Sequence, residues 1–366
     1  MGRKMDVTTQ TKTNGRILYF DFLRIFATFA VMVLHVAGQN WNGTSVPSFE
    51  WQTFNVFHSI TRFGVPIFVM ISGALFLNKR ELYTITGGGI YKLYKHNILR
   101  IVTAFIFWSA IYALPALLHG SSFKAVCKKI ITGHYHMWFL FMIVGLYMIV
   151  PFVKKIVESP VLTKYFLALA LVFTFIIPQA RDIASVFHKD LTVELVNSVI
   201  SKMNLSFIGG YTCYFILGHC LHTIELSKKA RCIIYALSML GFASTVLGCS
   251  FISIYNNKPN QILCGNFTLN VMLQGVGVFV FFKNLIDALK ISERMQIIIV
   301  RLSKYSFGAY LVHALIIEQL NWRLGLNTMS FNPVLSVISI SAIVFVISFV
   351  VSYVCNHIPV LNKYIV

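Results

Sequence analysis

The sequence predicts an all-α, polytopic membrane protein with about ten transmembrane helices. Of its 366 residues, 57% are hydrophobic and only 12% are charged, and the mean hydropathy is +0.73. Soluble domains carry roughly 25% charged residues, so this composition is suited to lipid. The apolar residues also lie in continuous runs of about 20, the length of a membrane-spanning helix, and not in the alternating segments of a membrane β-barrel.

Ten such runs follow one another along the chain. They cover residues 17–38, 56–77, 98–118, 136–153, 161–179, 206–224, 231–253, 268–288, 305–322 and 333–355. The fourth and the ninth are the weakest, because they are short and contain polar residues. We expect one transmembrane domain over residues 17–366, preceded by a polar, flexible cytoplasmic tail over residues 1–16.

The basic residues predict the orientation of these helices. With a cytoplasmic N-terminus, 21 of the 31 Lys and Arg residues lie in cytoplasmic loops and tails, nine lie in outer loops, and Arg24 lies within a helix. This asymmetry follows the positive-inside rule and predicts that both termini are cytoplasmic. Topology therefore explains most of the net charge of +19, and we expect the lipid bilayer as a partner and no nucleic acid.

The first apolar run contains an arginine and a histidine eleven positions apart, Arg24 and His35. Eleven residues of α-helix turn by roughly 1100°, about three turns plus 20°, and rise about 16 Å, so both side chains share one face at two depths. Asp21, Thr28 and Gln39 fall near the same stripe, with Asp21 one turn from Arg24 as its structural ion-pair partner. An arginine in hydrocarbon costs ~2.5–3.5 kcal/mol, so the stripe should face the protein interior or a wet cavity. A histidine held there indicates a transmembrane reaction site.

Three further stretches carry unusual combinations of residues. Residues 61–73 read TRFGVPIFVMISG, in which the small Ser72–Gly73 pair permits close helix contact. Residues 135–140 read YHMWFL and place a histidine and a tryptophan at the start of the fourth run. Residues 308–317 read GAYLVHALII and place a tyrosine and a histidine on one helical face.

Together with Arg24 and His35, these stretches resemble the membrane-bound acyltransferase-3 family over residues 16–355. The resemblance is strongest to the WecH-like branch of bacterial inner-membrane enzymes that O-acetylate surface polysaccharide. It implies about ten helices, an acyl-CoA donor that enters from the cytosol, and a carbohydrate acceptor on the outer face. It also carries over Arg24 and His35 as the essential pair.

The family's basic motif near the third helix is only partly matched. Arg100 matches the second arginine of that motif, whereas Asn97 stands at the position of the first. Lys95 or His96 would then replace the missing charge. The resemblance therefore implies a donor site here, with a departure at one of its two arginines.

The resemblance and the residue types together give each candidate an expected role. His35 is expected to act as a general base or as a transient acyl carrier, and Arg24 to contact the phosphates or thioester of the donor. Candidate donor-binding residues are Arg100, Lys95 and Lys92, although anchoring of the lysines to anionic lipid explains them equally well. Candidate acceptor-binding residues are Arg62, His136, Trp138, Tyr310 and His313, with interfacial anchoring or helix packing as the competing explanation. Expected structural residues are Asp21, Ser72 and Gly73.

We therefore expect an integral membrane O-acetyltransferase of the bacterial inner membrane. It would move an acetyl group from cytosolic acetyl-CoA to a hydroxyl of a surface polysaccharide or its lipid-linked precursor. Direct transfer and an acetyl-histidine route fit the sequence equally. The seven cysteines show no C-x-x-C pair, and no metal is expected.

Two other functions remain open. One is a transporter of a glycan precursor or small anion, with Arg24 as counter-ion and His35 as proton relay. The other is a catalytically silent scaffold in a glycan-assembly complex.

Overall fold

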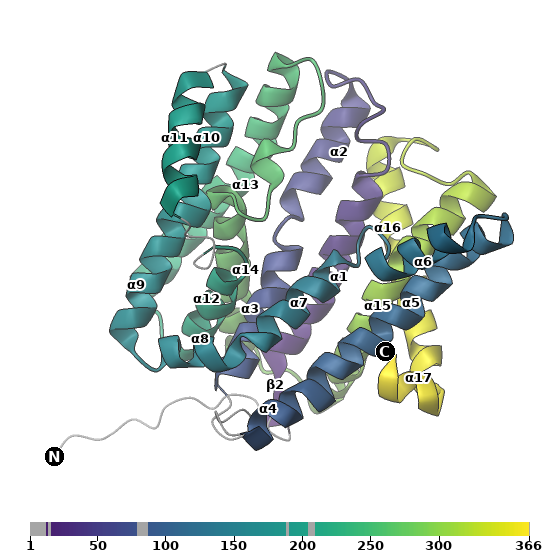
Figure 1. Cartoon of the computed structure of the whole chain (residues 1–366), viewed down its shortest axis with the longest axis horizontal. Coiled ribbons are helices and arrows are strands. Elements are labelled where there is room, and N and C mark those ends of the chain that lie inside the picture. The colour runs from purple at the N-terminus through teal and green to yellow at the C-terminus, as the bar shows by residue number, and fades with distance from the viewer. Residues whose placement is uncertain (1–11, 14–15, 79–86, 188–189, 204–208, 366) are drawn as a thin grey trace.

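A computed structural model describes residues 12–13, 16–78, 87–187, 190–203 and 209–365 of the chain. It is a helical bundle, in agreement with the predicted all-α class (Figure 1). A single pair of two-residue strands precedes the first helix in the described ranges, with β1 (Lys12–Thr13) antiparallel to β2 (Arg16–Ile17). Most of the tail predicted to be flexible lies outside the described residues.

The helices after the strands connect in sequence order. Their bounds are α1 (Leu18–Ala37), α2 (Phe49–Ile60), α3 (Gly64–Asn78), α4 (Gly87–Leu93), η1 (Tyr94–Ile98), α5 (Leu99–Leu118), α6 (Phe123–Thr132), α7 (Trp138–Met148), α8 (Val150–Val157), α9 (Pro160–Ala170), η2 (Leu171–Ile176), α10 (Ile177–Val186), α11 (Asp190–Met203), α12 (Thr212–Thr223), α13 (Lys228–Tyr255), η3 (Ile262–Cys264), α14 (Leu269–Ala288), α15 (Glu293–Leu324), α16 (Pro333–His357) and α17 (Pro359–Tyr364).

Seven helical stretches of the described chain are long and apolar enough to cross a membrane. They are Leu18–Ala37, Phe49–Asn78, Gly88–Leu118, Pro160–Val186, Lys228–Tyr255, Ile262–Ala288 and Pro333–His357. The pair α7 and α8 makes an eighth candidate, bent by 60°. The bend lies next to Pro151, whose ring nitrogen has no hydrogen to donate to the preceding turn.

Two of the ten predicted spans are not among these eight. The run at 206–224 corresponds to α12, which is only 12 residues long. The run at 305–322 lies in α15, which has 32 residues and carries charged side chains near both ends. A multi-pass helical chain is therefore supported, whereas the count of ten spans and the cytoplasmic termini stay predictions.

Polar side chains explain where several helices begin. The Ser227 hydroxyl accepts a hydrogen bond from the Ala230 amide at the start of α13, and Asn332 accepts one from the Val334 amide at the start of α16. These bonds satisfy amides that have no partner within the first turn. At the C-terminal end of α15, Gly325 adopts φ 63°, a left-handed conformation that glycine adopts without strain.

The first helix is the centre of the bundle. It packs against α2, α3, α14, α15 and α16. Buried apolar residues between 18 and 30 belong to one large hydrophobic cluster, shared with α3, α12 and α14, and those between 31 and 37 belong to a second, shared with α2, α5, α15 and α16. Of the predicted polar stripe, Asp21 and Thr28 are buried, and Arg24, His35 and Gln39 are partly buried.

Glycines bring α3 and α12 into direct backbone contact. A Cβ atom added at Gly73 would overlap the carbonyl oxygen of Phe215, and one added at Gly218 would overlap the carbonyl oxygen of Met70. The two helices can approach this closely only because neither position carries a side chain.

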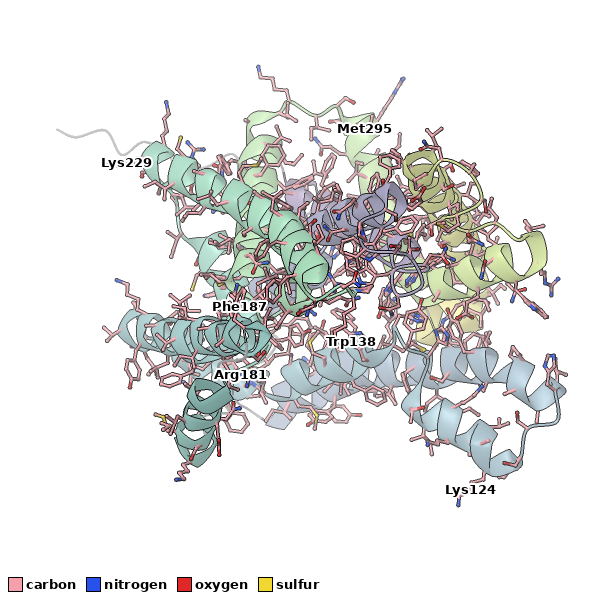
Figure 2. The ribbon with its side chains drawn as sticks, turned by 90° about the horizontal axis from the view of Figure 1, so that it is seen from above. Lys124, Trp138, Arg181, Phe187, Lys229 and Met295 are labelled. Atoms are coloured by element: carbon pink, nitrogen blue, oxygen red, sulfur yellow. The ribbon has the colours of Figure 1, made fainter. Side chains whose placement is uncertain are left out.

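The outside of the bundle carries apolar side chains, as a lipid-facing surface requires. On α13, Leu240, Leu247 and Phe251 are all exposed. Figure 2 shows the charged side chain of Lys229, at the start of the same helix, extending from the periphery of the molecule. Apolar exposure along the helix and charge at its end are typical of a membrane-spanning segment.

Candidate functional site

The predicted catalytic pair lines two different cavities near the two ends of α1. Arg24 lines a cavity of about 510 Å³, here called the Arg24 cavity. His35 lines one of about 360 Å³, here called the His35 cavity. The described residues that line them have no member in common. The polar side chains of α1 therefore line two separate cavities, at different positions along the helix.

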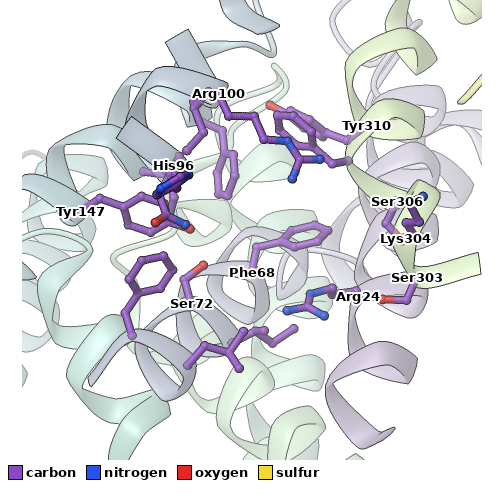
Figure 3. Close-up of a pocket in the computed structure, with 18 of the residues that line it drawn as sticks. Arg24, Phe68, Ser72, His96, Arg100, Tyr147, Ser303, Lys304, Ser306 and Tyr310 are labelled. Carbon is purple, nitrogen blue, oxygen red and sulfur yellow. The ribbon is translucent and has the colours of Figure 1, made fainter. Parts of the chain in front are cut away.

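The Arg24 cavity is strongly basic. Four cations line it, Arg16, Arg24, Arg100 and Lys304, and its described lining contains no aspartate or glutamate. Figure 3 shows the guanidinium groups of Arg24, on α1, and Arg100, on α5, pointing into the same space. This excess of positive charge makes the cavity suited to an anion that carries several oxygens.

A buried carboxylate positions two of these cations. Asp21 is fully buried and accepts hydrogen bonds from Arg16 Nη2 at 2.8 Å and Arg16 Nε at 3.0 Å. It also accepts one from Arg24 Nη1 at 3.3 Å. One negative charge is thus shared between two guanidinium groups, and the cavity remains basic.

The basic segment before α5 contributes only part of what was predicted. Arg100 lines the Arg24 cavity and lies 6.0 Å from the ring of Phe307. Lys92 and Lys95 are exposed on α4 and η1 and are absent from the lining of both cavities. Their assignment to the donor site stays a prediction. His96 and Asn97, on η1, do line the cavity.

The His35 cavity has a different chemistry. Its polar lining residues are Gln39, Asn40, His58, Tyr135, Glu318, Asn321 and Asn327. Asn40 donates hydrogen bonds to Thr328 Oγ1 at 2.8 Å and to Asn327 Oδ1 at 3.3 Å, which joins the segment after α1 to the segment after α15. Amide, hydroxyl and imidazole groups predominate here, which suits a polar ligand rich in hydroxyl groups.

Four histidines form a cluster beside this cavity, His35, His134, His136 and His313. The ring centre of His313 is 5.2 Å from that of His35 and 5.0 Å from that of His136. His136 Nδ1 is 3.1 Å from His134 Nδ1, and His134 Nε2 is 2.9 Å from Glu318 Oε1. The cluster therefore connects His35 to an acidic residue that lines the same cavity.

The histidine cluster contains polar atoms without a described partner. Both His136 Nε2 and His313 Nε2 are buried and lack a hydrogen bond to any described group. His136 lies in the turn before α7, where burial, reinforced by the neighbouring His313 and His35, lowers its pKa well below its ordinary value. Burial therefore favours the neutral form of this imidazole.

Tyr310 and its neighbours separate the two cavities. Tyr310 lines the Arg24 cavity and donates a hydrogen bond from its hydroxyl to the carbonyl of His136 at 2.5 Å. Its own carbonyl bonds to His313 Nδ1, also at 2.5 Å, and the ring of His313 faces His35. We call Tyr310, His136 and His313 the partition.

Of the remaining predicted residues, only Ser72 lines one of the two cavities. Arg62 lines neither cavity and contacts His58, with Nη2 2.5 Å from His58 Nε2 and 3.1 Å from His58 Nδ1. Trp138 is 41% exposed, has its ring centre 5.8 Å from that of Tyr211, and lines neither cavity. Ser72 lines the Arg24 cavity, while Gly73 contacts α12.

Sequence reasoning missed several residues of the site. Arg16 and Lys304 were counted only as topology-determining charges, and His134 was not singled out. Glu318 did carry a signal, because an acidic residue within a predicted membrane run is costly unless it has a partner or a function. Across the described chain, no group of three or more His, Cys, Asp or Glu side chains is placed to hold a metal ion.

Comparison with known proteins identifies one match. A family model described as an acyltransferase domain, of acyltransferase family 3, matches residues 17–356 and thus nearly the whole chain. Neither the curated proteins nor the solved structures contain a match to this chain. The matched range begins one residue after Arg16 and includes the whole histidine cluster and the partition.

Proposed function

Because the chain belongs to acyltransferase family 3, we propose that this membrane acyltransferase moves an acetyl group from cytosolic acetyl-CoA to a hydroxyl of a surface polysaccharide or its lipid-linked precursor. The observation that carries the proposal is the pair of cavities along one helix. The one that Arg24 lines is basic, and the one that His35 lines is rich in amide and imidazole groups. A bacterial inner membrane is the location that this chemistry and the predicted topology favour.

The Arg24 cavity is the proposed donor site. Coenzyme A carries several phosphate oxygens, and arginine and lysine form charge-assisted hydrogen bonds to them. Arg100 and Lys304 approach the cavity from α5 and α15, and Arg24 approaches it from α1. The positive-inside asymmetry favours a cytoplasmic position for this end of the bundle, where coenzyme A is present.

The His35 cavity is the proposed acceptor site. Gln39, Asn321 and Asn327 provide amide donors and acceptors that match the hydroxyl groups of a sugar ring. His35 lies in the same wall, so a bound hydroxyl can approach its imidazole. The acceptor would enter from the side opposite the basic cavity.

The chemistry follows from a neutral imidazole next to a hydroxyl. His35 removes the proton as the acceptor oxygen attacks the thioester carbonyl, an ester bond forms, and the C–S bond breaks to release the coenzyme A thiolate, which takes up a proton. In the alternative route, His35 itself first accepts the acetyl group and then passes it to the hydroxyl. In both routes the thioester carbonyl must reach His35, so the partition around Tyr310 must move during the reaction.

The direct test is transfer of label. Membranes that contain the chain, supplied with acetyl-CoA labelled in the acetyl group, should incorporate base-labile label into lipid-linked or polymeric glycan. Membranes of the same cells without the gene should not. Label that stays in acetyl-CoA when glycan acceptor is present would contradict the proposed function and would favour a transporter or a scaffold.

The basic cavity gives a separate prediction about donor binding. Lys304→Gln should raise the KM for acetyl-CoA about fivefold, since it removes one cation worth ~1 kcal/mol to a phosphate. The matched control is Lys229→Gln, an exposed lysine at the start of α13 that lines neither cavity and should leave the KM unchanged. An increase in the KM for acetyl-CoA in Lys95→Gln, with no increase in Lys304→Gln, would instead favour the donor site expected from the sequence.

A further inference from the structure

Two buried cysteines face each other in a part of the bundle that the proposed reaction does not use. The sulfur atoms of Cys249, on α13, and Cys264, at the end of η3, are 3.0 Å apart. Both side chains are 1% exposed. Neither lines the Arg24 cavity or the His35 cavity.

The pair lies on the side of the bundle that the charge asymmetry places outside the cytoplasm. Helix α13 begins with the basic residues Lys228, Lys229 and Arg231. Cys249 comes 21 residues after Lys228, which is ~30 Å along a helix and thus about one membrane thickness away. Compartments outside the cytoplasm favour disulfides over thiols.

We propose that Cys249 and Cys264 form a disulfide bond in the mature protein. A small rotation of either side chain brings the two sulfur atoms to bonding distance. The bond forms by exchange with the disulfide of a thiol oxidoreductase in the outer compartment. The two cysteines lose two protons and two electrons, one S–S bond forms between them, and the disulfide of the oxidoreductase becomes a dithiol. Because both sulfurs are buried in the folded state, this exchange takes place before α13 and η3 finish packing.

The bond would fix the outer connection between α13 and α14. It closes the segment 249–264, which includes Gln261, and Gln261 Oε1 lies 3.5 Å from Arg62 Nη2. Cys264 also contacts the hydroxyl of Ser59, the residue next to His58 on α2. The disulfide would therefore stabilise the wall of the His35 cavity. The link runs from Gln261 to Arg62 and from Arg62 to His58, which lines the cavity.

The test counts thiols in the full-length protein. Cells are quenched with acid, the protein is denatured, and free thiols are modified with a maleimide that adds a fixed mass, with and without prior reduction. The wild-type chain should gain two more labels after reduction than before. Cys249→Ser should show no such difference, whereas Cys213→Ser, which removes a buried cysteine of α12, should keep the difference of two.

Equal labelling of the wild-type chain before and after reduction would overturn the proposal. A difference that persists in Cys249→Ser would also overturn it, because another pair would then carry the bond. Mass spectrometry of unreduced wild-type peptides gives a second measurement that needs no variant to fold. A cross-linked pair that contains Cys249 and Cys264 supports the proposal, and their recovery as separate alkylated peptides refutes it. This outcome is independent of acetyl transfer, so failure of one proposal leaves the other standing.

Discussion

His35→Ala should abolish transfer of acetyl label to glycan and leave the amount of protein in the membrane unchanged. General acid–base catalysis contributes about 10²–10⁴-fold, so residual transfer should fall to background in a standard assay. The side chain of His35 lines a cavity and is only partly buried, so its removal leaves little unfilled space in the core. The measurement is initial rate per amount of membrane protein.

A second histidine provides the matched control. His119 is exposed just after α5 and lines neither cavity, so His119→Ala should transfer label at the wild-type rate. Transfer by His35→Ala within tenfold of wild type would remove His35 from the mechanism. In the wild-type protein, incubation with labelled acetyl-CoA but no acceptor distinguishes the two routes, because only the acyl-carrier route leaves label on the peptide that contains His35.

Gly73→Ala should prevent stable packing of α3 against α12. The added methyl group would overlap the carbonyl oxygen of Phe215, which is backbone and cannot rotate away. Overpacking of this kind costs 1–3 kcal/mol, and we expect about 3 kcal/mol or more because two whole helices must separate. The thermal midpoint of the detergent-solubilised protein, followed by size-exclusion chromatography, should fall strongly, and less protein should accumulate in the membrane.

The control for this substitution is another glycine inside a helix. A Cβ atom added at Gly145, on α7, meets no atom within 4 Å. Gly145→Ala therefore should keep or slightly raise the thermal midpoint, since alanine favours the helix. Equal midpoints for Gly73→Ala and Gly145→Ala would show that the α3–α12 contact is looser than described.

Helical periodicity explains which parts of the site could be read from the sequence. Arg24 and His35 lie on one helix, so their shared face follows from the fixed rotation per residue. The cost of a charge in lipid predicts that this face is turned inward, and both side chains do line cavities. Asp21 pairs with Arg24 for the same local reason.

Residues brought together by packing between helices could not be predicted in this way. Lys304 reaches the Arg24 cavity only because α15 packs against α1, and no local pattern specifies that contact. His134 joins the histidine cluster through the turn before α7, whose backbone is not helical and whose side-chain directions have no fixed period. Trp138 follows the same turn and points elsewhere, although it is only two residues from His136.

The apolar runs predicted the positions of helices better than they predicted which helices are long enough to span a membrane. The run at 206–224 begins in residues that the structure does not describe. Within its described part the helix is the short α12. The run at 305–322 is part of a helix with many buried residues, which tolerates polar side chains because protein rather than lipid surrounds them. Hydropathy alone does not distinguish these two situations.

The partition has a consequence for the energetics of the cell. An open channel between the two cavities would let protons and small ions pass down their gradients at every turnover. Tyr310 lines the Arg24 cavity and is bonded to the carbonyl of His136, and the two cavities share no described lining residue. If the proposed function holds, an enzyme of this design would pass a two-carbon unit outward, keep the nucleotide carrier inside the cell, and preserve the electrochemical potential on which the cell depends.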